Sequence, residues 1–409
     1  MNYDVIVVGA GASGLSAAIS AARCGARVLV LEKLKKAGTK LYATGNGNAN
    51  VSNTHMDAAS CFDSCGKDAS AFLGELFGSK RADEQVRAFL ATIGVSLVDR
   101  NGYLYPASKQ ASTVVWSLLD EARRLSVEMK TGCSVTSVRR EDEGDRAVYK
   151  AGTEAGDIYC GTRLILACGG AAAPKLGGSK IGYSLAHTLG HSVNDPSPAL
   201  CPLIVRDTDH FSVLKGVRAR ALATAYDRDG NVLRSEEGEV QFTDLGLSGI
   251  VIFNMSYPVP DRISLDLLQG ISALTNMVSL REQFSGRTLI ALLNGYMNDK
   301  LSEYIVRNCG YERNTGVSDV EDRELAGLFE TARHLTFEVT KADGFDHAQV
   351  TAGGVLLSEI NPSTMESLVS PGLFITGELL DVHGICGGYN LTSAFLSGIA
   401  AGCAAGGGI

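Results

Sequence analysis

The sequence predicts an α/β protein in which a parallel-sheet domain is interrupted by an inserted second domain. A β-branched strand, a glycine-rich turn and a small-residue helix open the 409-residue chain. Glycine-rich strands and a last helix, from 391 to about 402, return near its end. Between them, after a proline-containing linker at 195–198, the pattern changes to short strands and then to charged helices.

We assign residues 1–194 and 345–409 to one discontinuous domain and residues 195–344 to the insert. The insert is expected to have a β-barrel-like part over about 195–270 and a helical part over about 271–344. Turn residues such as Asp229-Gly230 separate its strands. These strands are expected at 203–206, 219–226, 232–234 and 239–242.

The first domain opens with a strand–helix–strand unit. Tyr3–Val8 is a buried strand by its β-branched run, and Leu15–Cys24 is a helix that ends at Gly25. The second strand, Arg27–Leu31, precedes Glu32. Further helices are expected at 69–77, 83–93 and 108–125, with Ser108 as the N-cap of the last. A hairpin turn is expected at Asn101-Gly102, and further strands at 127–130, 134–139, 147–150, 163–167, 350–357 and 373–377.

Composition excludes several classes of function. The 37 basic and 45 acidic residues give a net charge of −8 without long like-charge blocks, which indicates neither a nucleic acid nor a membrane surface as partner. Ten cysteines in irregular spacing, with no C-x-x-C, predict reduced thiols and a cytoplasmic protein. The apolar run from Val5 to Ala22 follows Asp4 and contains three glycines, so it predicts a strand and a helix rather than a signal peptide. His187 and His191 stand four apart, but no Cys or carboxylate completes a metal site, so no metal is expected.

The fingerprint Gly9-x-Gly11-x-x-Gly14 predicts a dinucleotide site. Its first glycine allows a tight turn, the second allows backbone to approach a pyrophosphate, and the third allows close helix–strand packing. The motif alone is weak. Here it follows a strand and opens a helix, and Glu32 stands at the end of the second strand, where a carboxylate accepts ribose hydroxyls.

Two later segments favour FAD over a simple nicotinamide site. Residues 164–170 form a strand that runs into small residues, and residues 372–378 form a late strand that ends in Gly377-Glu378. Two-dinucleotide-binding flavoproteins use such a late strand to hold the FAD ribitol. The sequence has no second G-x-G-x-x-G after a strand and no C-x-x-x-x-C. FAD is therefore expected as the resident cofactor, and any nicotinamide such as NAD(P)H would bind only as a transient co-substrate.

Several blocks resemble the BaiN/YhiN-like family of NAD(P)/FAD-dependent oxidoreductases, also called aminoacetone-oxidase-family flavoproteins. The resemblance spans nearly the whole chain. The blocks are Lys40-Leu41-x-x-Thr44-Gly45-Asn46-Gly47, Phe242-Thr243-x-x-Gly246-Leu247-Ser248-Gly249, Val350-Thr351-Ala352-Gly353-Gly354-Val355, Thr364-Met365-Glu366-Ser367 and Gly377-Glu378-x-x-Asp381-x-x-Gly384-x-x-Gly387-Gly388-Tyr389-Asn390.

The resemblance implies a two-dinucleotide-binding-type, Rossmann-like FAD domain with the interrupted architecture described above. It also implies NAD(P)H-dependent reduction of a carbon–carbon double bond conjugated to a ketone, with steroid-like bile-acid intermediates as one substrate class. Two alternatives stay open. One is an oxygen-using amine oxidase, and the other is a flavin-binding redox sensor or accessory protein of RNA modification. The substrate is expected to be a small molecule, and the oligomeric state is left open.

Together, these observations predict the cofactor-binding residues. Of the lysines after Glu32, only one or two are expected to face phosphates, and we assign Lys33 and Lys40. The full predicted set is Gly9, Gly11, Ala12, Ser13, Gly14, Glu32, Lys33, Lys40, Thr44, Gly45, Asn46, Val135, Ala167, Gly169, Gly377, Glu378, Asp381, Gly388, Tyr389, Asn390 and Leu391.

The sequence departs from the family pattern at three places. Asn48-Ala49 replace an Arg-Cys pair, which removes a guanidinium, and Leu368 replaces a lysine. His383 stands where the family often has Asp or a small polar residue. We predict His383 as the catalytic acid, because an imidazole titrates near neutral pH and hydride addition to an enone leaves an enolate that needs a proton. The alternative is that His383 only hydrogen-bonds a nearby carbonyl or the flavin edge.

Overall fold

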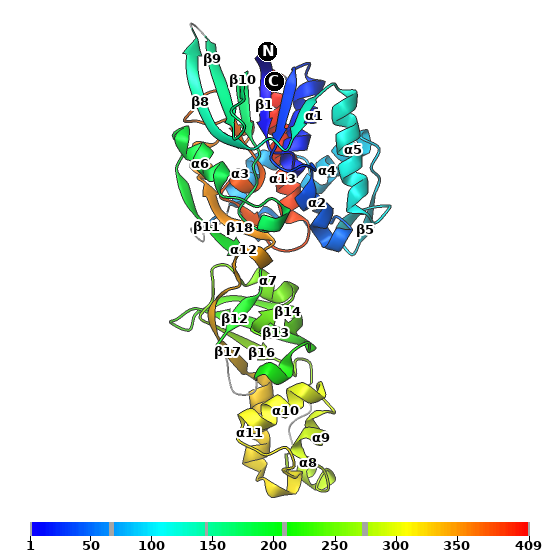
Figure 1. Cartoon of the computed structure of the whole chain (residues 1–409). Coiled ribbons are helices and arrows are strands. Elements are labelled where there is room, and N and C mark those ends of the chain that lie inside the picture. The colour runs from blue at the N-terminus through cyan, green and yellow to red at the C-terminus, as the bar shows by residue number, and fades with distance from the viewer. Residues whose placement is uncertain (1, 65–68, 144–145, 207–210, 272–276, 408–409) are drawn as a thin grey trace. The chain divides into compact units, whose positions relative to one another are not determined.

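The computed structural model describes residues 2–64, 69–143, 146–206, 211–271 and 277–407. The chain divides into two compact units, which are described separately (Figure 1). One unit comprises Met1–Pro198 and Ala348–Ile409, and the other is Ala199–His347. The sequence placed these boundaries at 194/195 and 344/345.

The first unit contains a parallel sheet with the strand order β7-β2-β1-β10, and β19 pairs with β10 as well. The central strands β1 and β2 are buried apolar runs over Val5–Val8 and Val28–Leu31, as expected where both faces of a parallel sheet are covered, whereas the edge strand β7 is more polar and exposed. Val8, at the end of β1, lies opposite Leu166 and Leu31. An antiparallel meander, β8-β9-β10, continues from the sheet. The bounds are β1 (Asn2–Val8), β2 (Val28–Glu32), β7 (Glu128–Thr131), β8 (Val135–Glu143), β9 (Arg146–Thr153), β10 (Ile158–Leu166) and β19 (Leu373–Ile375).

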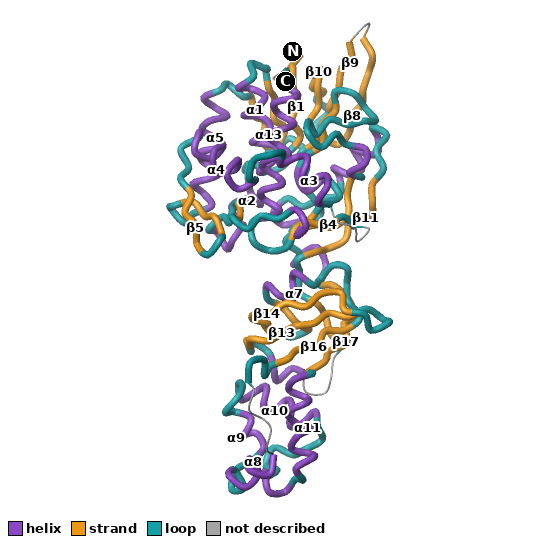
Figure 2. Tube along the Cα trace, turned by 180° about the vertical axis from the view of Figure 1, so that it is seen from behind, coloured by secondary structure: helices purple, strands orange, loops and turns teal. Residues whose placement is uncertain are grey.

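Two helices with small residues, α1 (Ala12–Arg23) and α13 (Tyr389–Ala405), pack side by side against this sheet (Figures 1 and 2). A Cβ at Gly398 would lie 2.3 Å from the Ser13 carbonyl oxygen, and one at Gly402 would lie 2.2 Å from that of Ala17. Glycine is therefore required for this close approach. The other helices of the unit are α2 (Thr39–Ala43), α3 (Ser70–Phe77), α4 (Ala82–Thr92), α5 (Ala111–Arg124) and α6 (Ile181–Thr188).

Smaller sheets complete the first unit. The predicted hairpin at Asn101-Gly102 is confirmed, since both residues have positive φ between two paired strands. Residues 195–198 are not a linker but part of a strand that pairs with β18; its prolines are tolerated because the sheet has only two strands. The N-cap of α5 is Gln110 rather than Ser108. The strands are β3 (Ser52–Asn53), β4 (Cys61–Phe62), β5 (Leu97–Arg100), β6 (Tyr103–Pro106), β11 (Val193–Ala199), β18 (Val350–Val355) and β20 (His383–Gly384).

The second unit contains a closed antiparallel barrel, β12-β15-β14-β13-β16-β17, as the sequence predicted for its β part. Its core includes Phe211, Phe242 and Phe337, whose ring centroids lie 5.6 to 6.3 Å apart. The two strands predicted at 232–234 and 239–242 are one strand, β14. The bounds are β12 (Leu203–Val205), β13 (Arg218–Tyr226), β14 (Val232–Phe242), β15 (Gly246–Ser248), β16 (Arg262–Asp266) and β17 (Leu335–Ala342).

The helical part of this unit is shorter than predicted. It ends at Arg333, and the chain returns to the barrel as β17, where Leu335 and Phe337 are buried while Thr336 and Glu338 are exposed. This alternation is the period of a half-buried strand. The helices are α7 (Ile250–Asn254), α8 (Met277–Gln283), α9 (Leu289–Leu293), α10 (Asp299–Asn308), α11 (Asp322–Arg333) and α12 (Gly344–His347). Over the described residues, no helix has the length and apolar character needed to cross a membrane.

Candidate cofactor and active site

The predicted cofactor residues gather where the parallel strands end. Gly9 follows β1, Glu32 ends β2, Ala167 follows β10, and Gly377 is the second residue after β19. Parallel pairing brings these strand ends to one edge of the sheet. Ligands of open α/β sheets bind at this carboxyl edge.

The three positions of the fingerprint contain glycine for different physical reasons. A Cβ at Gly9 would lie 2.3 Å from the Ala167 carbonyl oxygen, and one at Gly14 would lie 2.0 Å from the Gly9 carbonyl oxygen. Packing therefore requires both glycines. A Cβ at Gly11 would meet no described atom within 4 Å, and φ there is −82°, which any residue adopts. The open space above Gly11 fits the approach of a pyrophosphate to the backbone, so the residues present fit a dinucleotide.

The first turn of α1 supplies backbone donors beside this space. Gly11 is its N-cap and, within the described chain, no side chain caps the helix. Ala12 and Ser13 are almost completely buried, so this turn can offer a ligand its backbone N–H groups rather than these side chains. Such groups and the positive end of the helix dipole favour an anion.

Glu32 is buried and held by the backbone. Its Oε2 accepts from the Ala10 amide at 2.7 Å, and its Oε1 accepts from the Leu34 amide at 2.8 Å. Each carboxylate oxygen can accept a further bond, so the group stays able to bind ribose hydroxyls. The Cys133 amide donates to the Glu32 carbonyl oxygen, which brings the segment before buried Val135 to the same corner.

Lys33 and Lys40 are placed differently. Lys33 is half-buried, and desolvation lowers its pKa, although neighbouring Glu32 opposes this shift. Lys40 Nζ lies 2.7 Å from Glu378 Oε2, an ion pair between residues far apart in sequence. The structure thus joins two residues that the sequence had assigned to the cofactor separately.

Two residues beside Glu378 were missed by sequence reasoning. The Thr351 amide donates to Glu378 Oε1 at 2.9 Å, and the Thr351 hydroxyl accepts from the Ala172 amide. Tyr183 on α6 is buried nearby, and burial together with the charge of Glu378 raises the pKa of its phenol. Thr351 lies in the segment Val350–Val355, which resembles the family, whereas no local sequence pattern indicates Tyr183.

Asp381 is buried, and its carboxylate is occupied by protein donors. It accepts from the Ser64 amide at 2.9 Å, from the Ser64 hydroxyl at 2.7 Å and from the Asn194 side chain at 2.7 Å. These bonds join three chain segments. The geometry therefore gives Asp381 a structural part at the site.

His383 is also buried, on strand β20, with its ring 6.2 Å from that of Phe62. Burial lowers the pKa of its imidazole to about 4, and the charges of Asp381 and Asp63 oppose this shift. Desolvation thus disfavours the imidazolium and acts against titration of this ring near neutral pH.

The segment Thr44-Gly45-Asn46 forms a tight turn in which Gly45 and Asn46 have φ of 56° and 53°. The Asn48 side chain donates to the Gly45 carbonyl oxygen at 2.9 Å, and the Ala49 amide donates to that of Thr44. Asn48 and Ala49, which depart from the family pattern, thus hold this turn together. Leu368, the other departure, is 64% exposed, and nothing in the structure explains it.

A second helix N-terminus completes the site at α13. Gly388 is the N-cap, with φ of 95°, and a Cβ there would lie 2.7 Å from the backbone of Ser52. Asn390 bonds the amide and the carbonyl of Gly384, which fixes the loop before the helix. Tyr389 is buried and donates to the His55 carbonyl oxygen at 3.2 Å.

Leu391 lies in the first turn of α13, behind the loop that Asn390 fixes. Gly169, in the loop after β10, has φ of 70°, and a Cβ there would meet no described atom within 4 Å. Gly169 thus resembles Gly11 in leaving open space beside the backbone. A glycine is also required by its left-handed conformation.

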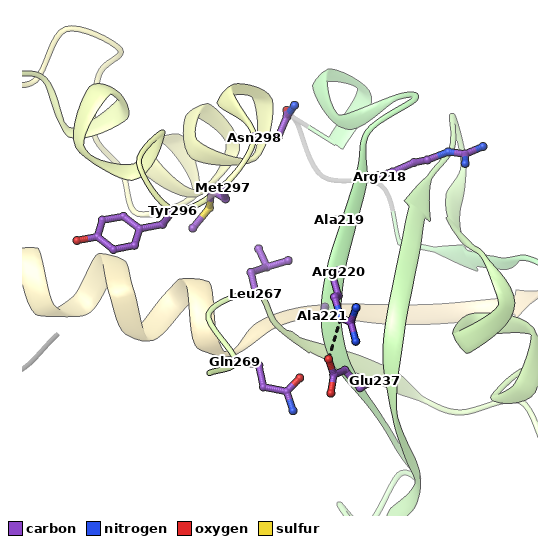
Figure 3. A pocket seen from close by; sticks show the side chains of 10 residues that line it. All are labelled: Arg218, Ala219, Arg220, Ala221, Glu237, Leu267, Gln269, Tyr296, Met297 and Asn298. Carbon is purple, nitrogen blue, oxygen red and sulfur yellow. Dashed lines mark hydrogen bonds and ion pairs between the residues drawn. The ribbon is translucent and has the colours of Figure 1, made fainter. Parts of the chain in front are cut away.

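The second unit has a pocket of about 330 Å³ of its own, between strand β13 and the segments before α10 (Figure 3). Arg220 Nε donates to Glu237 Oε1 at 2.8 Å on one side of it. Its lining is largely polar, which is unlike the apolar cavity that a steroid-sized ligand requires. The lining residues are Arg218, Ala219, Arg220, Ala221, Glu237, Leu267, Gln269, Tyr296, Met297 and Asn298.

Known proteins resemble this chain over its whole length. The HI0933-like protein Rossmann domain matches residues 3–404. A 3-dehydro-bile acid delta(4,6)-reductase of Clostridium scindens is 35% identical over 98% of this chain and 98% of that protein. A ribosomal RNA dihydrouridine synthase of Escherichia coli is 27% identical over 97% of this chain and 96% of that protein. A solved 3-ketosteroid-delta4-(5alpha)-dehydrogenase of Rhodococcus jostii is 16% identical over 99% and 97% of the two chains, with a TM-score of 0.49. The chain belongs to the HI0933-like Rossmann family, the BaiN/YhiN-like flavoproteins, and is a FAD-dependent oxidoreductase.

Proposed function

We propose that this enzyme uses NAD(P)H to reduce a carbon–carbon double bond conjugated to a carbonyl in a small apolar substrate. The observation that carries the proposal is the 35% identity, over 98% of both chains, to a protein named as a bile acid delta(4,6)-reductase. The dihydrouridine synthases support the reaction class independently. Saturating uridine also reduces a double bond conjugated to a carbonyl, so two relatives with unlike substrates share one kind of reaction.

In this proposal bound FAD would supply the hydride-transfer chemistry between the nicotinamide and the double bond. The chain's own part is binding and orientation. Gly11 and the first turn of α1 would hold the pyrophosphate, and Glu32, already held by two amides, would hold the ribose. The uncapped start of α13 offers further N–H groups to developing negative charge.

The proton that completes the reduction needs a separate source. With a pKa of about 4, His383 is neutral at neutral pH and holds too little imidazolium to serve as the acid. We therefore assign His383 a hydrogen-bonding role. The candidate donors are water, an insert-domain residue and the Tyr389 phenol, which keeps its proton because burial raises its pKa but donates that proton to the His55 carbonyl oxygen in this structure.

A small molecule is favoured over ribosomal RNA by the charge of the insert. Residues 199–347 contain 15 basic and 22 acidic residues, so this unit has a net charge of −7 out of −8 for the chain. Binding to RNA rests on basic side chains that neutralise phosphates. An insert with this balance repels a polynucleotide, whereas a neutral or apolar substrate is indifferent to it.

Anaerobic stopped-flow reduction of the purified flavoprotein tests the proposal. NADH or NADPH is expected to bleach the flavin, a panel of amines is not, and a 3-oxo-4-ene steroid is then expected to reoxidise it. Free uridine and a ribosomal RNA fragment serve as the competing acceptors. Reduction by an amine with indifference to both nicotinamides would refute the reductase, and reoxidation by RNA alone would refute the small-molecule substrate.

A further inference from the structure

Two cysteines lie near one another on the first unit, at the carboxyl ends of α1 and α13. Cys24 is the C-cap residue of α1 and is exposed. Cys403 lies in the last turn of α13 and is partly exposed. Cys403 stands between Gly402 and Gly406, whose Cβ positions would lie 2.7 Å from the Cβ atoms of Ser20 and Cys24. Cys24 is also among the groups that raise the pKa of the Cys403 thiol. Neither cysteine takes part in the cofactor site.

The contact is set by the packing of the two helices. Ser13 meets Gly398 and Ala17 meets Gly402, so α1 and α13 run parallel with a constant offset between their residue numbers. At the end of this stripe, a Cβ at Gly406 would lie 2.7 Å from the Cys24 Cβ. Packing this close leaves the helices no room to slide, because a shift of one residue would place side chains where only glycine fits. The two thiols are therefore held together by the fold.

We propose that Cys24 and Cys403 form a reversible disulfide when a peroxide oxidises the protein. The Cys24 thiolate attacks one peroxide oxygen, forming an S–O bond as the O–O bond breaks, and the released hydroxide takes up a proton as water. The Cys403 sulfur then displaces the second oxygen, which also leaves as water. Two thiols and one hydrogen peroxide thus give one disulfide and two waters.

The surroundings fix the order of these steps. Cys24 is exposed to solvent and to a small oxidant. Burial raises the pKa of the Cys403 thiol, so Cys403 forms less thiolate and is assigned the second step. The product would join the carboxyl ends of two helices whose amino ends lie at the cofactor edge of the sheet. This site is independent of the proposed substrate.

Thiol counting on the whole flavoprotein tests the disulfide. The reduced protein has ten cysteines, so ten thiols are expected in denaturant before treatment and eight after brief exposure to hydrogen peroxide. Peptide mass spectrometry is expected to find Cys24 linked to Cys403, and dithiothreitol is expected to restore ten thiols. Cys24→Ser and Cys403→Ser should each start at nine thiols and form no linked peptide.

Cys133→Ser is the matched control, because Cys133 is also partly exposed with a raised pKa but lies away from the pair. It is expected to fall from nine thiols to seven with the same linked peptide. Ten remaining thiols in the oxidised wild type would overturn the proposal. A loss of thiols without the Cys24–Cys403 peptide, or with the same loss in Cys24→Ser, would overturn it as well.

Discussion

Replacing the fingerprint glycines one at a time separates their roles in folding from their role in binding. Gly11→Ala places a methyl group where no described atom lies within 4 Å, at a backbone conformation open to alanine. Gly14→Ala places the same group 2.0 Å from the Gly9 carbonyl oxygen. The two variants differ by three residues in position and carry the same change, so each is the other's control.

The expected magnitudes are opposite for the two variants. Gly11→Ala should change the free energy of unfolding by less than about 1 kcal/mol, and its methyl group should displace a phosphate from the backbone. A lost backbone bond to a charged group is worth about 1.5–3 kcal/mol, so the dissociation constant for FAD should rise about 10- to 150-fold. Gly14→Ala should lower the free energy of unfolding by about 1–3 kcal/mol or more, because the rigid carbonyl cannot move away.

Both quantities are measured on protein stripped of flavin, since bound FAD would itself raise the apparent stability. Denaturant unfolding gives the free energy, and titration with FAD gives the dissociation constant. Wild-type affinity in Gly11→Ala would refute the assignment of the open space to the pyrophosphate. An apoprotein of Gly14→Ala as stable as the wild type would refute the packing argument.

Three further predictions follow from buried groups. Lys40→Met and Glu378→Gln should each weaken FAD retention and lower the free energy of unfolding. A double-mutant cycle on the free energy of unfolding should give a coupling energy of about 1 kcal/mol, and additive effects would show that the two residues do not act as a pair. His383 has its pKa lowered to about 4 from about 6.5 in the unfolded chain, so it contributes stability above about pH 6.5 that is lost as the pH falls toward about 4, roughly 3 kcal/mol in all. Urea unfolding of His383→Gln at both ends of this range should show a correspondingly smaller loss than wild type. Phe337→Ala should lower the free energy of unfolding by about 3–5 kcal/mol, measured by denaturant unfolding, because its ring fills the barrel core.

Much of the fold was predictable because hydrophobic periodicity is a local signal. The run at Tyr3–Val8 matches β1 closely, whereas the run at 163–167 matches only the buried second half of β10, which begins at Ile158. Both runs are mainly apolar because the two faces of a parallel strand are buried. The errors arose where a long-range contact decides the structure. Residues 195–198 form a strand only because β18 lies beside them, and Leu335–Ala342 closes a barrel whose earlier strands end some seventy residues before it.

The site shows the same division. One strand–helix–strand unit contains Gly9, Gly11, Gly14 and Glu32, so their separation in the sequence determines how far apart they lie in the fold. The ion pair of Lys40 with Glu378 joins positions 338 residues apart, and no pattern in either segment predicts this pairing. Contacts of this kind follow from the order of strands in the sheet, which the sequence only implies.

His383 illustrates why residue type alone does not decide chemistry. An isolated imidazole titrates in the range useful for catalysis, and from the sequence this made His383 the natural acid. Strand β20 buries the ring against β4, and the cost of desolvating a charge outweighs the attraction of Asp381 and Asp63. The Asp381 carboxylate already accepts hydrogen bonds from Ser64 and Asn194, so it cannot turn toward the His383 ring without breaking those bonds. The neutral ring is therefore a consequence of the same packing that holds the loop before α13 in place.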